Sequence, residues 1–194
     1  MSGAASELPI LSFSSSREWE AWLGEHHESS GPVYVKIAKK GSGIESITQP
    51  EAVEVALCWG WIDSQGRRLD DEYWLLRLSR RTARSKWSKS NTERASKLID
   101  EGAMQPPGLR EVERAKADGR WDAAYDSPRT ATVPGDLRQA LDRDPAARAF
   151  FAELDGANRY AILHRIQDAK RPETRVRRIE KFVAMLSEGK KIHP

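Results

Sequence analysis

Residues 48–63 read TQPEAVEVALCWGWID, and the fold prediction starts from these letters. Thr48 and Glu51 have the spacing of a capping box, Pro50 occupies the first turn, and the apolar residues that follow predict a buried helix. Gly60 lets the chain turn sharply between two indoles, because glycine adopts backbone angles that other residues avoid. Trp61 then begins a predicted strand. A buried helix that leads directly into a strand indicates a helix packed on a sheet.

The flanking segments supply the rest of this predicted sheet and its helices. A second capping-box pattern at Ser15 and Glu18 begins a helix that ends before Gly31. Alternating β-branched residues predict a strand at 33–38. The remaining elements are a hairpin within 61–69 that turns at Gln65-Gly66, a strand at 73–78, and helices at 90–102 and 109–119.

Residues 127–132, Ser-Pro-Arg-Thr-Ala-Thr, form the predicted linker. Beyond it the spacing predicts only helices, which begin near Pro134, Asp144, Tyr160 and Pro172. We therefore expect an α+β fold, with a small antiparallel sheet flanked by helices in an N-terminal domain, 1–127. A helical C-terminal region, 133–194, follows it.

Composition and motifs exclude several classes of protein. The single cysteine, Cys58, excludes an internal disulfide and a multi-cysteine zinc site. No apolar run approaches the roughly 18–20 residues that span a bilayer. The N-terminus has no secretion signal, so we expect a cytoplasmic protein. The sequence contains no phosphate loop and no dinucleotide fingerprint, its four histidines are scattered, and we predict no cofactor and no metal.

Two segments concentrate positive charge, although the whole chain carries only +3. Within 77–97 eight Lys and Arg oppose one Glu, and within 161–194 nine oppose four acidic residues. Such runs are typical of phosphate-binding faces. They are equally typical of solvated surfaces that acids from elsewhere in the fold balance. Nucleic-acid binding through 77–97 and 165–191 is therefore kept as the lesser alternative for a partner.

The cluster Trp59-Gly60-Trp61-Ile62-Asp63 supplies the candidate site. Two indoles beside a carboxylate suit a pocket floor, where flat rings stack and Asp63 positions a cationic or hydroxyl group. Alternatively, both indoles pack in the core and Asp63 caps the turn. We predict a Trp-lined, cation-rimmed ligand cleft formed by Lys36, Lys39, Trp59, Trp61, Asp63, Arg67, Trp74, Arg77, Trp87 and Lys89. No catalytic residue is predicted, and Cys58 is interpreted as a buried filler.

Several motifs, in order, resemble the YdeI/OmpD-associated family, also called bacteriocin-protection proteins. Those of the N-terminal part lie at 19–23, 39–43 (KKGSG), 56–63 (ALCWGWID), 84–91 (RSKWSKSN) and 119–125 (GRWDAAY). Those of the C-terminal part are VPGDL at 133–137, AKRPETR at 169–175 and RIEK at 178–181. The resemblance spans nearly the whole chain. It implies a role in resistance to bacteriocins and cationic antimicrobial peptides, and it supplies no catalytic residues.

We therefore expect a non-enzymatic binding protein that acts in bacteriocin, antimicrobial-peptide or stress resistance, with an unidentified small-molecule or peptide ligand. Its oligomeric state is left open. One alternative is an enzyme that acts on a small anionic or aromatic substrate, with Asp63 as the acid or base. The other is a nucleic-acid-binding protein that uses the two basic segments.

Overall fold

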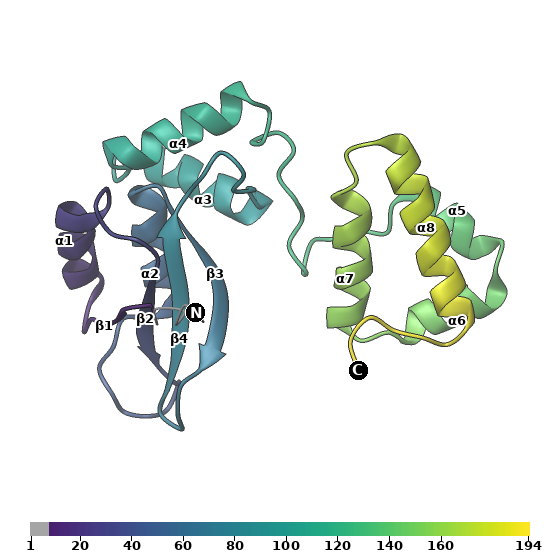
Figure 1. Ribbon diagram of the computed structural model, residues 1–194, viewed down its shortest axis with the longest axis horizontal. Helices are drawn as coiled ribbons and strands as arrows, with labels where there is room; N and C mark the ends of the chain where they lie inside the picture. Colours follow the sequence, from purple (N-terminus) through teal and green to yellow (C-terminus); the bar gives the residue numbers. More distant parts are fainter. Residues whose placement is uncertain (1–7) are drawn as a thin grey trace, which may run out of the picture. The chain divides into compact units, whose positions relative to one another are not determined.

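The computed structural model describes residues 8–194, which divide into two compact units (Figure 1). The sheet unit contains the described residues up to Trp87 together with Asn91–Ala123, and the helical unit contains Ser88–Ser90 together with Ala124–Pro194. Residues 8–194 form eight helices and one four-stranded sheet, so the predicted α+β class is confirmed. The domain limits 1–127 and 133–194 stay a prediction.

The sheet is mixed and has the strand order β1-β2-β4-β3. Its strands are β1 (Ile10–Ser12), β2 (Val33–Ala38), β3 (Trp61–Arg68) and β4 (Tyr73–Arg80). The β2–β4 and β3–β4 pairs are antiparallel, whereas β1 runs parallel to β2 because helix α1 (Ser16–His26) carries the chain back between them. The predicted all-antiparallel sheet is therefore wrong in this one strand. Three residues are too few to show an alternating pattern.

The hairpin of β3 and β4 turns at residues 69–72, and the predicted turn at Gln65-Gly66 is wrong. Strand β3 continues through these residues with a bulge between Asp63 and Gly66, so that one extra residue is accommodated without reversing the chain. The true turn is closed by Asp70, whose carboxylate accepts the backbone amides of Glu72 at 2.9 Å and Tyr73 at 2.7 Å.

One face of the sheet is covered by α1 and α2 (Gln49–Cys58), which join it in a single core. The capping box of Thr48 and Glu51 is confirmed. At the other predicted box Ser15 does accept the Glu18 amide, but the Glu18 carboxylate binds the amide and hydroxyl of Ser14. The buried members of this core are Trp19, Leu23, Val33, Val35, Ile37, Ile47, Ala52, Val53, Ala56, Trp61, Leu76 and Leu78.

Two further helices, α3 (Lys89–Asp100) and α4 (Pro106–Ala117), lie at one end of the sheet (Figure 1). Helix α4 packs against the end of α2. This contact brings the start of α4 beside the turn that joins α2 to β3.

The helical unit consists of α5 (Gly135–Asp142), α6 (Pro145–Glu153), α7 (Gly156–Gln167) and α8 (Pro172–Ser187), which share a core of their own. Asp144 and Asp155 cap α6 and α7 through the amides of Ala147 and Asn158. In the described part of the chain, every helix is too short or too polar to cross a bilayer.

Candidate ligand-binding site

The sheet unit contains a hollow of about 280 Å³ where four elements meet. These elements are the end of α1, the turn between α2 and β3, the end of β4 and the first turns of α4. The residues that line it are His27, Glu28, Trp59, Gly60, Arg80, Arg81, Thr82, Pro107, Arg110 and Glu111.

Two glycines allow the backbones around the hollow to approach each other. Gly60 has φ +72°, and a Cβ there would lie 2.9 Å from the carbonyl oxygen of Pro107. Gly108 is tighter still, since a Cβ would lie 2.2 Å from the carbonyl oxygen of Cys58. Only glycine at these positions lets α4 rest directly on the α2–β3 turn. The wall that carries Arg110 and Glu111 is therefore held against the wall that carries Trp59.

An aromatic pair forms one side of the hollow. The rings of His27 and Trp59 lie 4.8 Å apart between centroids, tilted by 49°. His27 Nδ1 donates to the carbonyl oxygen of Leu23 at 3.0 Å, since a carbonyl oxygen can only accept, and Nε2 lies 3.6 Å from a Glu28 carboxylate oxygen. Trp59 Nε1 is buried, and no described residue accepts its proton. The pair offers a flat, largely apolar surface with polar atoms at its margin.

Three arginines line the hollow beside this pair. Arg80 Nη1 donates to the carbonyl oxygen of Glu28 at 2.7 Å, and Arg110 lies 3.4 Å from the Glu28 carboxylate. Arg81 is only 5% exposed; its Cζ lies 3.7 Å from the centre of the Trp87 ring, and its Nη1 donates to the carbonyl oxygen of Lys86.

The charges of the hollow favour an anion. Its two carboxylates, Glu28 and Glu111, face three guanidiniums, and Glu111 is also paired with Arg114 from the same helix. A guanidinium presents a planar fork of donors that matches carboxylate and phosphate oxygens. The arrangement therefore suits a small ligand with an acidic group and a flat apolar part.

Cys58, the single cysteine of the chain, directly precedes Trp59 in the sequence and is not an activated nucleophile. Burial, followed by the charges of Glu54 and Glu20, raises the pKa of the Cys58 thiol to about 11, so the thiol stays protonated at neutral pH. This agrees with its interpretation as a buried filler. Within residues 8–194, no three His, Cys, Asp or Glu side chains are grouped to hold a metal ion.

The structure does not gather the ten predicted site residues around one cleft. Trp59 alone among them lines the hollow. Trp61 and Trp87 are each 1% exposed: Trp61 lies in the core below α1, and Trp87 packs against Trp121 with ring centres 5.0 Å apart. Indoles are drawn into the interior because each buries a large apolar area. The alternative interpretation for the Trp59–Trp61 cluster, core packing, therefore describes Trp61, and Trp87 is buried as well.

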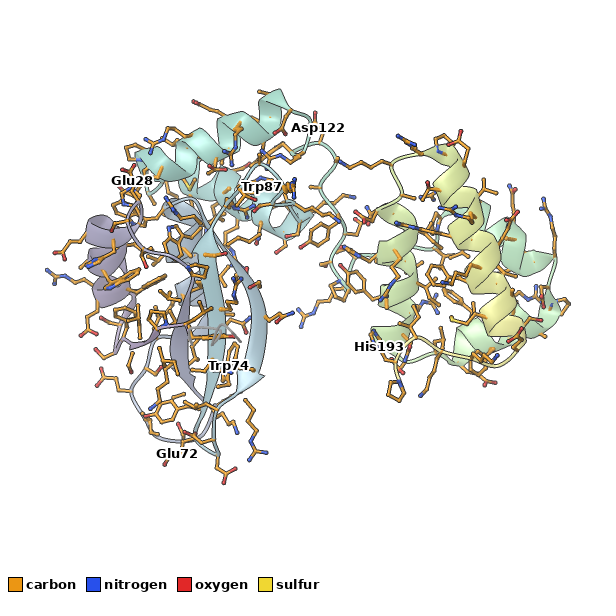
Figure 2. The ribbon with its side chains drawn as sticks, viewed as in Figure 1. Glu28, Glu72, Trp74, Trp87, Asp122 and His193 are labelled. Carbon is orange, nitrogen blue, oxygen red and sulfur yellow. The ribbon has the colours of Figure 1, made fainter. Side chains whose placement is uncertain are left out.

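The other predicted residues lie elsewhere. Trp74 is half-buried against the core, and Figure 2 shows it toward the opposite end of the sheet from Glu28. Asp63 is half-buried on β3, outside the hollow. Lys89 pairs with Asp126 at 2.6 Å in the helical unit, and Lys39 donates to the carbonyl oxygen of Asp70.

Three predicted cations do come together, on the face of the sheet that α1 and α2 leave open. They are Lys36, Arg67 and Arg77, whose places in the strand register put them on the same side as Leu75. They form a surface separate from the hollow.

The lining residues that the sequence did not reveal come from distant segments. Arg80 and Arg81 belong to the basic run 77–97, which is the only signal that pointed toward them. His27, Glu28 and Arg110 carry no local pattern, because the packing of α1 and of α4 on α2 is what brings them to Trp59.

Known protein families match the two parts of the chain separately, with a division close to that between the sheet unit and the helical unit. Residues 11–111 match the family described as "Domain of unknown function (DUF8412)". Residues 130–189 match the family described as "Bacteriocin-protection, YdeI or OmpD-Associated". The expected resemblance to the second family is thus found in the C-terminal part, and the motifs before residue 130 lie outside that match. No curated protein and no solved structure matches the chain.

Proposed function

Because the chain belongs to the DUF8412 family and carries a YdeI/OmpD-associated region, we propose that it is a non-enzymatic binding protein of the YdeI/OmpD-associated type. Its ligand is a small anion held in the hollow of the sheet unit. The observation that carries this proposal is that Arg80, Arg81 and Arg110 line the same hollow as the Trp59–His27 pair.

The volume of the hollow limits the ligand to a compact molecule. Pockets for drug-sized ligands occupy roughly 300–1,000 Å³, and this hollow of about 280 Å³ falls just below that range. A carboxylate or phosphate group binds Arg80 and Arg110, and the remainder of the ligand packs on the ring of Trp59. Arg81, buried and stacked on Trp87, supplies a fixed positive charge behind them.

Binding needs little rearrangement of the charges already present. Arg110 and Glu28 are 62% and 72% exposed, and a solvated ion pair of this kind contributes about 0–1 kcal/mol. An acidic ligand group replaces Glu28 as the partner of Arg110 at small cost. The hydrogen bond from Arg80 goes to a backbone carbonyl, so it survives the exchange and holds that guanidinium in place.

The biological role we propose is protection against bacteriocins or cationic antimicrobial peptides, exerted from the cytoplasm. The description of the family that matches residues 130–189 supports it. A bacterial strain that depends on this chain should lose resistance to a cationic peptide when the gene is deleted, and regain it with the wild-type gene but not with Arg80→Gln/Arg110→Gln. Full rescue by that double variant would show that resistance does not depend on anion binding in the hollow.

The direct test is a thermal-shift screen with inorganic phosphate, citrate and aromatic carboxylates. A ligand that binds only the folded state at about a hundredfold excess over its Kd stabilises by about 2.7 kcal/mol, which raises Tm by about 5 °C or more in a unit of this size. Arg80→Gln/Arg110→Gln abolishes the shift, whereas the charge-matched control Arg17→Gln/Lys97→Gln, on α1 and α3, retains it. No shift with any anion, or equal shifts in both variants, would overturn the proposal.

A further inference from the structure

The open face of the sheet, opposite to the side that α1 and α2 cover, carries an ordered set of six side chains. The strand register places Tyr34 beside Arg77 and Lys36 beside Leu75, with Arg67 on the far side of Leu75 and Tyr73 one row further along β4. Directly opposed residues in antiparallel strands point to the same face. These six residues are called the open face below.

The long cationic side chains of the open face lie along the sheet. Lys36 Nζ lies 3.6 Å above the ring centre of Tyr73, and Arg67 Cζ lies 4.6 Å from that of Tyr34. To reach Tyr34 on β2 from β3, Arg67 must cross β4 beside Leu75, which is fully buried. The cations are therefore held in place by aromatic rings.

These cations lack carboxylate partners. Neither Lys36, Arg67 nor Arg77 forms an ion pair with any described residue, and Arg77 Nη1 donates to the hydroxyl of Ser64 at 3.1 Å. The strand residues that point to this side include no Asp or Glu. In the adjoining turn, the Asp70 carboxylate accepts backbone amides. The same carboxylate acts on Lys36 only at longer range, so the face combines three cations that form no close ion pair with two half-buried tyrosines.

We propose that the open face binds single-stranded nucleic acid, DNA and RNA alike. Phosphates bind the three cations. One base stacks on the outer face of the Arg67 guanidinium, which lies over Tyr34, and a second stacks on Tyr73 once Lys36 turns from that ring to a phosphate. Phosphate contacts and stacking are the two contacts that sequence-tolerant single-strand binding uses. The rows of Tyr34 and Tyr73 lie four strand residues apart, about 13 Å, which accommodates two or three nucleotides. Charge complementarity and the two half-buried rings beside the cations favour this occupant over an acidic peptide, which has no need of stacking.

The test is fluorescence anisotropy with labelled oligothymidylate and oligouridylate of about 8 nucleotides, using the full chain. Both strands should bind, and duplex DNA of the same length should bind at least about tenfold more weakly, because its bases cannot unstack onto the face. Lys36→Gln/Arg67→Gln/Arg77→Gln should reduce the affinity by at least about tenfold and lower the slope of log K against log salt by about 2, since each phosphate contact contributes about 0.7.

The control removes three exposed cations of the same unit, Arg17→Gln/Arg84→Gln/Lys97→Gln, and should leave binding within about twofold. Tyr34→Phe should bind like the wild type and Tyr34→Leu about tenfold more weakly, with folding of both checked by far-UV circular dichroism. Equal losses in the two triple variants, equal binding of duplex, or binding of anionic lipid vesicles but not of oligonucleotides would overturn the proposal. Failure here leaves the phosphate response of the hollow unaffected, because the two surfaces share no residue.

Discussion

Replacing Gly108 by alanine tests the packing that creates the hollow. The new Cβ would lie 2.2 Å from the carbonyl oxygen of Cys58 and 2.8 Å from its carbonyl carbon, about 1.2 Å inside ordinary contact with rigid backbone. Helix α4 must move away, which also strains the hydrogen bond from the Gln105 amide to the same oxygen. Overpacking and a weakened buried hydrogen bond together should cost about 3 kcal/mol.

The assay is urea unfolding followed by tryptophan fluorescence, because all seven tryptophans lie in the sheet unit. A cost of about 3 kcal/mol should lower the urea midpoint by about 1.5 M. Since α4 carries Arg110, the variant should also lose the anion-induced rise in Tm.

The control is Gly31→Ala in the same unit, between α1 and β2, where the added Cβ meets nothing within 4 Å. It should leave stability unchanged or raise it by about 0.5 kcal/mol. If Gly108→Ala unfolds at the same urea concentration as the wild type, the close approach of α4 to Cys58 is not a constraint on the fold and the reasoning about the walls of the hollow is wrong.

Three further predictions concern the helical unit and the thiol. Arg175 donates hydrogen bonds to both carboxylate oxygens of Asp136 and lowers the pKa of that carboxyl group. The pair therefore stabilises the folded state fully above the unfolded carboxyl pKa, near 4, and this stabilisation is lost as the pH falls through the lower pKa of the folded state. Asp136→Asn should therefore cost about 1 kcal/mol at pH 7 after solvent screening, measured as the hydrogen-exchange stability of α5–α8, and progressively less as the pH falls below about 4; a cost that does not change with pH would argue against the pair. Asn158 is 1% exposed, and its side-chain oxygen accepts hydrogen bonds from the backbone amides of residues 192–193. Asn158→Ala should therefore lower the free energy of unfolding by about 2–4 kcal/mol and speed hydrogen exchange of those two amides. Unchanged exchange would refute these hydrogen bonds. Cys58, with a pKa of about 11 and a buried thiol, should react with a disulfide reagent only as fast as the protein unfolds, whereas rapid reaction of the native chain would contradict its burial.

Local physics made several elements predictable from the sequence. The capping box at Thr48 and Glu51 and the alternation at 33–38 depend on neighbours a few residues apart, and both appear in the structure as expected. Strand β1 and the bulge near Gln65 did not appear in the predictions. A three-residue strand carries no periodic signal, and Gln65-Gly66 has the composition of a turn although pairing with β4 keeps it extended.

The site was harder to predict because its parts meet only through tertiary packing. Trp59 lines an arginine-bearing hollow, but the sequence assigned other indoles to the same site, whereas Trp61 and Trp87 fill the interior. The arginines of the hollow lie at the end of β4 and on α4, and nothing local distinguishes them from solvated cations. Three of the five cations that were proposed as its rim, Lys36, Arg67 and Arg77, instead share the open face.

An NMR titration with inorganic phosphate tests the central claim most directly. If guanidiniums from β4 and α4 converge on Trp59 to bind an anion, added phosphate should shift the indole N–H of Trp59 and the backbone amides of His27 and Arg110 along one saturable curve. The Arg80→Gln/Arg110→Gln variant should show no such curve. Phosphate shifts that leave Trp59 and His27 unmoved, or that persist in this variant, would contradict the claim.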